Sequence, residues 1–207
     1  MCLLLIKNTQ PKRFRINFFM TFLCFTALML IGCTAPEPAI SKYQINFNFS
    51  QVNSYAFYKR NSDFSEFQNI SDTTRNSIEL AIEQVLDKNG FIYRLTNDAD
   101  IIVTYHMVNE NSKELLNYNK GVAYCSFCLR GGEAQKDKKQ WKVRPGSLII
   151  DVIDPEQKRS VWRSVYYLKI NDKKDNSAET QIKIYQAIDA MIKKYPYSRN
   201  LSTADNA

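Results

Sequence analysis

The fold is decided by the stretch Leu148-Ile149-Ile150-Asp151-Val152-Ile153, followed by the turn 154–158 (DPEQK) and the segment 161–170 (VWRSVYYLKI). The mostly apolar hexapeptide predicts a strand, and the Asp-Pro start of the segment that follows predicts a turn. Along the second segment, alternate positions place on one face Trp162, Tyr166, Leu168 and Ile170. We therefore expect an antiparallel hairpin whose apolar face lies on the core.

A third strand is predicted at 101–108 (IIVTYHMV). One face would carry Ile101, Val103, Tyr105 and Met107, while the other would carry Ile102, Thr104, His106 and Val108. The second set is more polar, so we expect it to face solvent. Shorter strands are predicted at 45–49, where Ile45, Phe47 and Phe49 alternate with asparagines, at 55–58 and at 91–95.

Two segments have the apolar spacing of amphipathic helices. The first begins at Ser71 or Asp72, ends near Gly90, and has a stripe of Ile78, Ala81, Ile82, Val85 and Leu86. The second begins at Asn176, which with Glu179 resembles a capping box, and ends at Pro196. Its stripe consists of Ile184, Ile188, Met191, Ile192 and Tyr195.

These elements predict an α+β fold with two layers, in which two amphipathic helices pack on one face of an antiparallel sheet. The domain would span residues 43–197, and residues 198–207 would form a disordered tail. The polar, glycine-containing stretch 109–140 is interpreted as a long hairpin or loop.

The amino end has the pattern of a secretory signal peptide over residues 1–32. Four basic residues precede the apolar run 16–31, and Leu30-Ile31-Gly32-Cys33 looks like the bacterial lipobox. That resemblance implies cleavage before Cys33 and a covalent lipid on Cys33, with residues 33–42 as a lipidated tether. The alternatives are an uncleaved transmembrane anchor and a plain signal peptide, although the apolar run is short for a membrane span.

A lipidated Cys33 would attach the protein to a membrane, and no other cofactor is expected. Thr34 stands where an aspartate tends to retain lipoproteins at the inner membrane, which favours the outer membrane and its periplasmic side. The formal charge of +7 includes four charges within residues 1–15, so the mature protein would be near +3. Neither this charge nor an exported location favours a nucleic-acid partner.

Two cysteines remain once Cys2 and Cys24 are removed with the signal peptide and Cys33 is lipidated, namely Cys125 and Cys128. A disulfide that clips the loop is favoured in an oxidising compartment. A contact with a second copy or a metal, or a redox role, stays open. Because a structural zinc site needs four ligands and the chain has one histidine, we predict no metal site.

The sole histidine, His106, could share its sheet face with Thr104, Asp151 and Arg163 as a candidate ligand face. The alternative is a set of cross-strand polar pairs on a solvated face. No nucleophile elbow or phosphate-binding loop is present in the sequence, so no catalytic set is assigned and the protein is predicted not to be an enzyme.

Six segments in order resemble the bacterial lipoproteins grouped as domain of unknown function 4136, over about residues 43–197. They are Phe49-Ser50 with Ser54-Tyr55-Ala56-Phe57, Lys88-Asn89-Gly90-Phe91, the segment 99–106 (ADIIVTYH), the segment 146–154 (GSLIIDVID), Val161-Trp162-Arg163-Ser164, and Tyr195-Pro196. The resemblance implies a lipid-anchored envelope protein and no established activity. Cys125, Cys128 and the lysine-rich run 136–139 depart from the family pattern.

The sequence therefore predicts a lipid-anchored cell-envelope protein with a non-enzymatic binding or structural role. Its partner would be another envelope protein or a polysaccharide, and its candidate surfaces are the open sheet face and the loop 109–140. The alternative is a thiol-redox or metal-handling envelope protein that uses Cys125 and Cys128. No oligomeric state follows from the sequence.

Overall fold

The computed structural model describes residues 39–58, 70–129, 143–170 and 178–197. The chain divides into two units, 1–36 and 37–207, and all of the described residues belong to the second. The predictions of the signal peptide (1–32), of the lipidated Cys33 and of the disordered tail (198–207) therefore lie outside the described residues.

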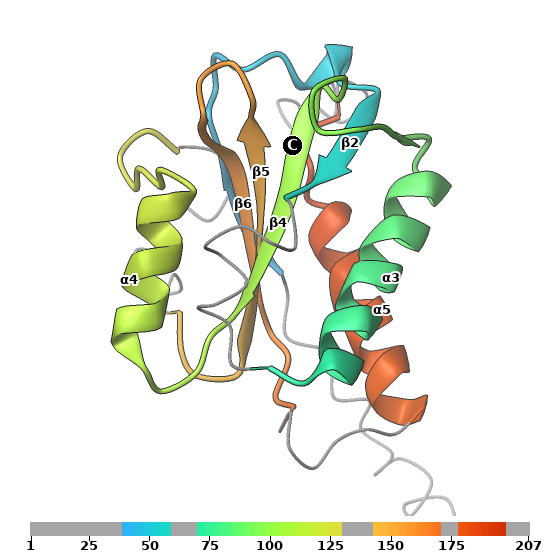
Figure 1. Cartoon of the computed structure of the whole chain (residues 1–207), viewed down its shortest axis with the longest axis vertical. Coiled ribbons are helices and arrows are strands. Elements are labelled where there is room, and N and C mark those ends of the chain that lie inside the picture. Colours follow the sequence, from blue (N-terminus) through green and yellow to red (C-terminus); the bar gives the residue numbers. More distant parts are fainter. Residues whose placement is uncertain (1–38, 59–69, 130–142, 171–177, 198–207) are drawn as a thin grey trace, which may run out of the picture. The chain divides into compact units, whose positions relative to one another are not determined.

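A mixed six-stranded sheet has the order β1-β6-β5-β4-β2-β3 (Figure 1). Its strands are β1 (Ile40–Tyr43), β2 (Ser54–Phe57), β3 (Ile92–Tyr93), β4 (Ile101–Met107), β5 (Ser147–Asp154) and β6 (Arg159–Tyr167). The first four strands in this order pair antiparallel, whereas β2 is parallel to both β3 and β4. The prediction of a purely antiparallel sheet is therefore wrong. A helix follows β2 before the chain returns to the sheet, and a crossover of this kind joins parallel strands.

The predicted hairpin of β5 and β6 is present, and it brings Asp151 opposite Arg163. Strand β4 pairs with β5 on its other side and brings Thr104 opposite Asp151. Three neighbouring strands therefore place these polar residues in one row across the sheet. All eight residues of β5 are buried, as expected of a strand with neighbours on both sides and cover on both faces.

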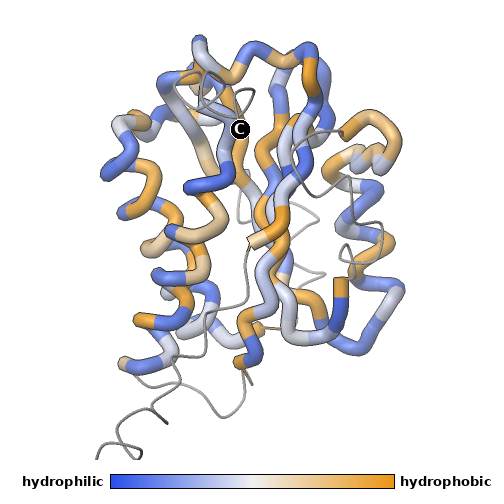
Figure 2. Tube along the Cα trace, turned by 180° about the vertical axis from the view of Figure 1, so that it is seen from behind, coloured by the Kyte–Doolittle hydropathy of each residue, from blue (hydrophilic) through white to orange (hydrophobic). Residues whose placement is uncertain are grey.

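The two predicted helices, α3 (Asp72–Lys88) and α5 (Ala178–Ile192), pack on one face of the sheet (Figure 1). Ser71 caps α3 by accepting a hydrogen bond from the Thr74 amide, and Gly90 adopts a φ of +86° just beyond its end. The predicted stripes of both helices join one core with alternate residues of β4, β5 and β6. Figure 2 shows the resulting alternation of apolar and polar positions along the tube.

A third helix, α4 (Ser112–Gly121), lies against the opposite face of the sheet (Figure 1). The interpretation of 109–140 as a loop or hairpin is therefore wrong for this part. Asn111 caps α4, with its side chain accepting a hydrogen bond from the Lys113 amide. The helix is polar for most of its length, and it packs mainly through Tyr118 and the adjoining Val122, so its apolar signal is weak.

The amino-terminal part of the domain differs from the prediction. Strand β1 begins at Ile40, so the last residues of the expected tether 33–42 belong to the sheet. The predicted strand at 45–49 is wrong, because this segment turns and leads into the 3-10 helix η1 (Phe49–Gln51). Phe47 and Phe49 pack against each other from that turn, with ring centroids 4.7 Å apart, which satisfies the aromatic alternation without a strand.

Candidate functional site

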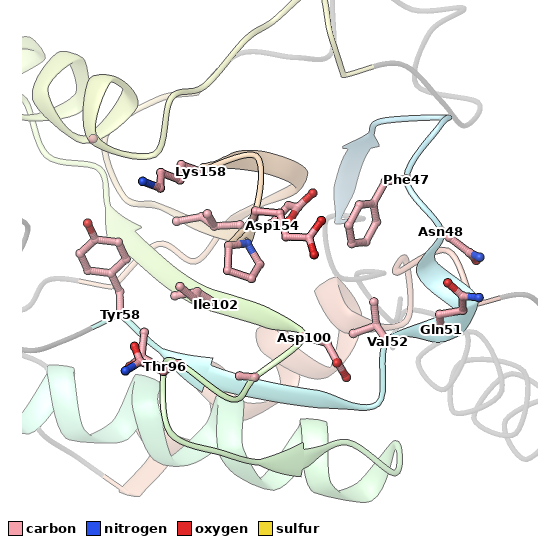
Figure 3. Close-up of a pocket in the computed structure, with 16 residues that line it drawn as sticks. Phe47, Asn48, Gln51, Val52, Tyr58, Thr96, Asp100, Ile102, Asp154 and Lys158 are labelled. Atoms are coloured by element: carbon pink, nitrogen blue, oxygen red, sulfur yellow. Dashed lines mark hydrogen bonds between the residues drawn. The ribbon is translucent and has the colours of Figure 1, made fainter.

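A cleft of about 830 Å³ lies where β4 begins and β5 ends. Residues from three segments line it, 47–52, 96–102 and 153–158, together with Tyr58 and Gly121 (Figure 3). The first segment contains η1, the second leads into β4, and the third contains the turn between β5 and β6. The cleft is therefore built from connections that the sheet brings to one end.

The lining combines an aromatic ring with many uncharged polar groups. Phe47, Asn48 and Gln51 lie toward one end of the cleft, while Tyr58 and Lys158 lie toward the other (Figure 3). Thr96 and Asn97 add a hydroxyl and an amide, and Ala99, Ile102 and Ile153 supply apolar surface. Hydroxyl and amide groups both donate and accept hydrogen bonds, and Glu156 and Lys158 add a carboxylate and an ammonium group to the lining.

The wall of the cleft beside Asp100 is held by hydrogen bonds between residues that are far apart in the sequence. One oxygen of the Asp100 carboxylate accepts bonds from the Asn53 amide (2.9 Å), the Ser54 amide (2.8 Å) and the Ser54 hydroxyl (2.8 Å). These bonds favour the charged carboxylate, and that of the Asn53 amide contributes most to lowering the pKa of Asp100. The carboxylate therefore ties the segment before β2 to the segment before β4.

The opposite wall is the turn between β5 and β6, which Asp154 organises. The Asp154 carboxylate accepts bonds from the Glu156 amide (2.9 Å) and from the Gln157 side chain (2.5 Å). Lys158 follows with a φ of +51°, in the left-handed region that non-glycine residues seldom adopt. Both aspartates in the lining are thus occupied in shaping the cleft.

The four residues predicted as a ligand face do gather, but below the protein surface. Thr104, His106, Asp151 and Arg163 are each at most 5% exposed, because α4 covers them. The expectation that this face is open to solvent is therefore wrong, and so is its interpretation as solvated polar pairs. Polar residues on alternate positions look solvent-facing in sequence, but here a helix from another part of the chain buries them.

Asp151 and Arg163 form the centre of this cluster. The Arg163 Nε lies 2.9 and 3.0 Å from the two carboxylate oxygens, and the Ser160 hydroxyl donates to the same carboxylate at 2.5 Å. From α4, the Tyr118 hydroxyl donates to Asp151 at 2.8 Å, and the Asn119 side chain accepts from Arg163 at 2.8 Å. Both charges therefore have several partners, which a buried ion pair requires.

Aromatic rings enclose the rest of the cluster. The guanidinium of Arg163 lies 3.5 Å from the ring centre of Tyr124, and the His106 ring stacks on Tyr118 with centroids 4.7 Å apart. Both ring nitrogens of His106 are buried and have no hydrogen-bond partner among the described residues. Burial, with a further contribution from Arg163, lowers the pKa of His106 to about 4. The only histidine of the chain is thus neutral and enclosed near pH 7.

Cys125 and Cys128 form a disulfide in the turn that follows α4. The guanidinium of Arg159, at the start of β6, donates to the Cys128 sulfur at 2.8 Å. Phe127, between the cysteines, is 89% exposed, whereas Tyr118 of α4 is buried. Within the described ranges, no group of three or more His, Cys, Asp and Glu side chains could hold a metal ion.

Several residues that shape these sites have no recognisable signal in the sequence. Tyr118, Asn119 and Tyr124 fell in a stretch interpreted as a loop, and the partners of Asp100 are 46 or more positions away in the chain. The position of Asp100 in the sequence does not indicate which amides its carboxylate binds.

The family model for a domain of unknown function (DUF4136) matches residues 40–197. The chain belongs to this family. The resemblance inferred from six short segments is therefore confirmed, with a boundary three residues earlier than expected. The earlier start agrees with β1, which begins at Ile40.

Three solved structures are similar to this chain at low identity. A DUF4136 family protein from Bacteroides thetaiotaomicron is 10% identical with a TM-score of 0.44, over 72% of this chain and 92% of that one. A PDZ domain protein from Parabacteroides distasonis is 13% identical with a TM-score of 0.42, over 84% and 40%. A PelC dodecamer from Paraburkholderia phytofirmans is 8% identical with a TM-score of 0.33, over 74% and 95%.

No curated protein matches the chain. In the part of the chain that the structure describes, no helix has both the length and the apolar character needed to cross a bilayer.

Proposed function

We propose that this member of the DUF4136 family is a lipid-anchored envelope protein that binds a hydroxyl-rich polysaccharide segment without chemically changing it. The observation that carries the binding role is the cleft of about 830 Å³ at the end of the sheet. Ligand-binding clefts commonly measure about 300–1,000 Å³ and combine apolar surface with a few oriented polar groups. The cleft has both properties.

The chemistry of the lining favours a saccharide. The amide groups of Gln51 and Asn97 can each donate and accept hydrogen bonds, as sugar hydroxyls require. The Asn48 amide can donate, while its oxygen already accepts from Ser50. The ring of Phe47 adds an apolar surface on which the face of a sugar ring can rest. Asp100 and Asp154 are already occupied by amide donors, and Glu156 and Lys158 carry charges of opposite sign, so the lining has little net charge beyond the two aspartates.

A binding role without catalysis is supported by where the titratable groups lie. His106 is fully buried beneath α4, and its ring nitrogens are turned to the interior. The carboxylates of Asp100 and Asp154 shape the walls of the cleft. A general base needs an accessible atom within hydrogen-bond reach of the substrate, which the enclosed His106 does not offer. One oxygen of Asp100 and both oxygens of Asp154 already accept hydrogen bonds from the protein.

The anchor is proposed from Leu30-Ile31-Gly32-Cys33, with the domain on the periplasmic side of the outer membrane. In cells fed an alkyne-tagged fatty acid, we expect the wild-type chain to be labelled and to sediment with membranes. Cys33→Ser should lose both properties, whereas Cys24→Ser, nine positions earlier in the apolar run, should retain them. A labelled or membrane-bound Cys33→Ser protein would overturn the proposed anchor.

Binding is tested by titrating the full-length chain in detergent with oligosaccharides prepared from envelope polysaccharides. Asn97→Trp places a large ring in the cleft and should weaken binding at least tenfold. Gln84→Trp, an exposed position on α3 outside the cleft, is the matched control and should leave binding unchanged. If both variants bind oligosaccharide like the wild type, or if the wild type binds no oligosaccharide, the proposed ligand is wrong.

A further inference from the structure

We propose that Cys125 and Cys128 form a thiol–disulfide exchange site that accepts electrons from dithiols. This inference is independent of the proposed binding of polysaccharide, because the residues involved lie outside the cleft lining. It rests on three observations: a main-chain amide that donates to one sulfur, a guanidinium that donates to the other, and an exposed aromatic residue between the two cysteines.

Each sulfur of the disulfide accepts a hydrogen bond. The Cys128 amide donates to the Cys125 sulfur at 3.2 Å, within the turn that the two residues form. Arg159 donates to the Cys128 sulfur at 2.8 Å from a different strand. Hydrogen-bond donors and positive charge stabilise a thiolate more than the neutral sulfur of a disulfide. The arrangement therefore favours the reduced form of the pair.

The position of Arg159 is built into the sheet. Arg159 opens β6 and pairs in register with Asp154 of β5. The Ser160 amide beside it donates to the Val122 carbonyl, which joins the start of β6 to the end of α4. The main chain at Arg159 is therefore fixed on both sides, which keeps its side chain within reach of the turn 125–128.

The surroundings allow a partner to approach. Ser126 and Phe127 are exposed, Phe127 to 89%, and both cysteines are partly exposed. An exposed phenylalanine between two cysteines offers an apolar contact next to the reactive bond. A buried structural disulfide lacks such access, and its sulfurs are inert.

The proposed reaction has two steps. The thiolate of an incoming dithiol attacks the Cys125 sulfur, and the Cys125–Cys128 bond breaks with its electron pair moving to Cys128, where Arg159 stabilises the thiolate. The second thiol of the partner then loses its proton to water and attacks the mixed disulfide. Cys125 leaves as a thiolate, the partner is oxidised to a disulfide, and the two cysteines are reduced.

The test uses the full-length chain in detergent, reduced with dithiothreitol and freed of it. The rate of alkylation by iodoacetamide is measured at pH 6 and assigned by mass mapping of the peptides that contain Cys125 and Cys128. We expect Arg159→Gln to alkylate roughly tenfold more slowly than the wild type, and Arg159→Lys to recover part of the rate, since nearby cations favour the thiolate. Arg94→Gln, an exposed arginine outside this site, should match the wild type.

The pH dependence of alkylation gives a second measurement, which needs no variant. The alkylation rate of the wild-type chain against pH should have a midpoint well below about 8.5, the ordinary value for a thiol. In mixtures of reduced and oxidised dithiothreitol, the wild type should remain reduced at conditions that oxidise Arg159→Gln. A midpoint near that of a free thiol, or equal rates for the wild type and Arg159→Gln, would overturn the proposal.

Discussion

Asp151 on β5 and Arg163 on β6 form an ion pair that is at most 2% exposed, and α4 covers it. The pair shares its carboxylate with Tyr118 and Ser160 and its guanidinium with Asn119. Because these partners come from α4 and from β6, the ion pair joins the helix to the sheet. The first predictions follow from this arrangement.

Removal of one charge should destabilise the fold strongly. Arg163→Met leaves the Asp151 carboxylate buried without its cation, which typically costs about 3–5 kcal/mol. We expect a decrease of that size in the free energy of unfolding measured with urea. The control is Lys183→Ala, which removes an exposed ion pair with Glu179 and should change stability by about 0.5 kcal/mol or less. Equal effects of the two substitutions would show that the buried pair is not a main contributor to stability.

Tyr118→Phe tests the contact from α4 to the same carboxylate. The substitution keeps the ring that stacks on His106 and removes only the hydroxyl, which donates to Asp151 at 2.8 Å. Loss of a hydrogen bond to a buried charge should lower the free energy of unfolding by about 2 kcal/mol. Tyr93→Phe, half exposed on β3, should have little effect in the same urea titration.

His106 should make stability depend on pH. Its pKa is about 4 in the folded chain and about 6.5 when unfolded, so the unfolded chain binds the proton first as pH falls. Stability is therefore full above about pH 6.5 and decreases by about 3 kcal/mol as pH falls toward 4. His106→Phe should flatten the dependence between pH 4.5 and 6.5 in urea titrations. Because the chain has no other histidine, an unchanged slope would contradict this assignment.

His106→Phe should also be at least as stable as the wild type at pH 7. The two ring nitrogens are buried without partners among the described residues, and an unpartnered buried polar atom is unfavourable. A phenyl ring can still stack on Tyr118. A large loss of stability at pH 7 would mean that the imidazole makes a contact that this arrangement does not contain.

The Asp100 carboxylate should protect the amides of Asn53 and Ser54, in the cleft wall at the start of β2, from exchange with solvent. Asp100→Asn weakens acceptance of the Asn53 and Ser54 amides, so we expect both amides to exchange hydrogen with solvent faster. Asp98→Asn, two positions earlier and exposed, should leave their exchange unchanged. In the wild type, the lowered pKa of Asp100 means that this protection persists above about pH 4 and is lost as pH falls through the lower folded value.

The sequence by itself determined the elements whose pattern is local. The hairpin of β5 and β6, strand β4 and helices α3 and α5 each bury one face, and residues two apart in a strand or three to four apart in a helix reveal that face directly. Six short segments also identified the family over nearly the same residues as the family model.

Only the tertiary structure decided the direction of β2, the presence of α4 and the burial of His106. A parallel pairing depends on how a helix crosses the sheet, which periodicity does not encode. Helix α4 gains its place through Tyr118, Val122 and hydrogen bonds to Asp151 and Arg163 rather than through a wide apolar stripe. Polar side chains that find partners only after folding look like surface residues in the sequence, since their burial depends on groups distant in the chain.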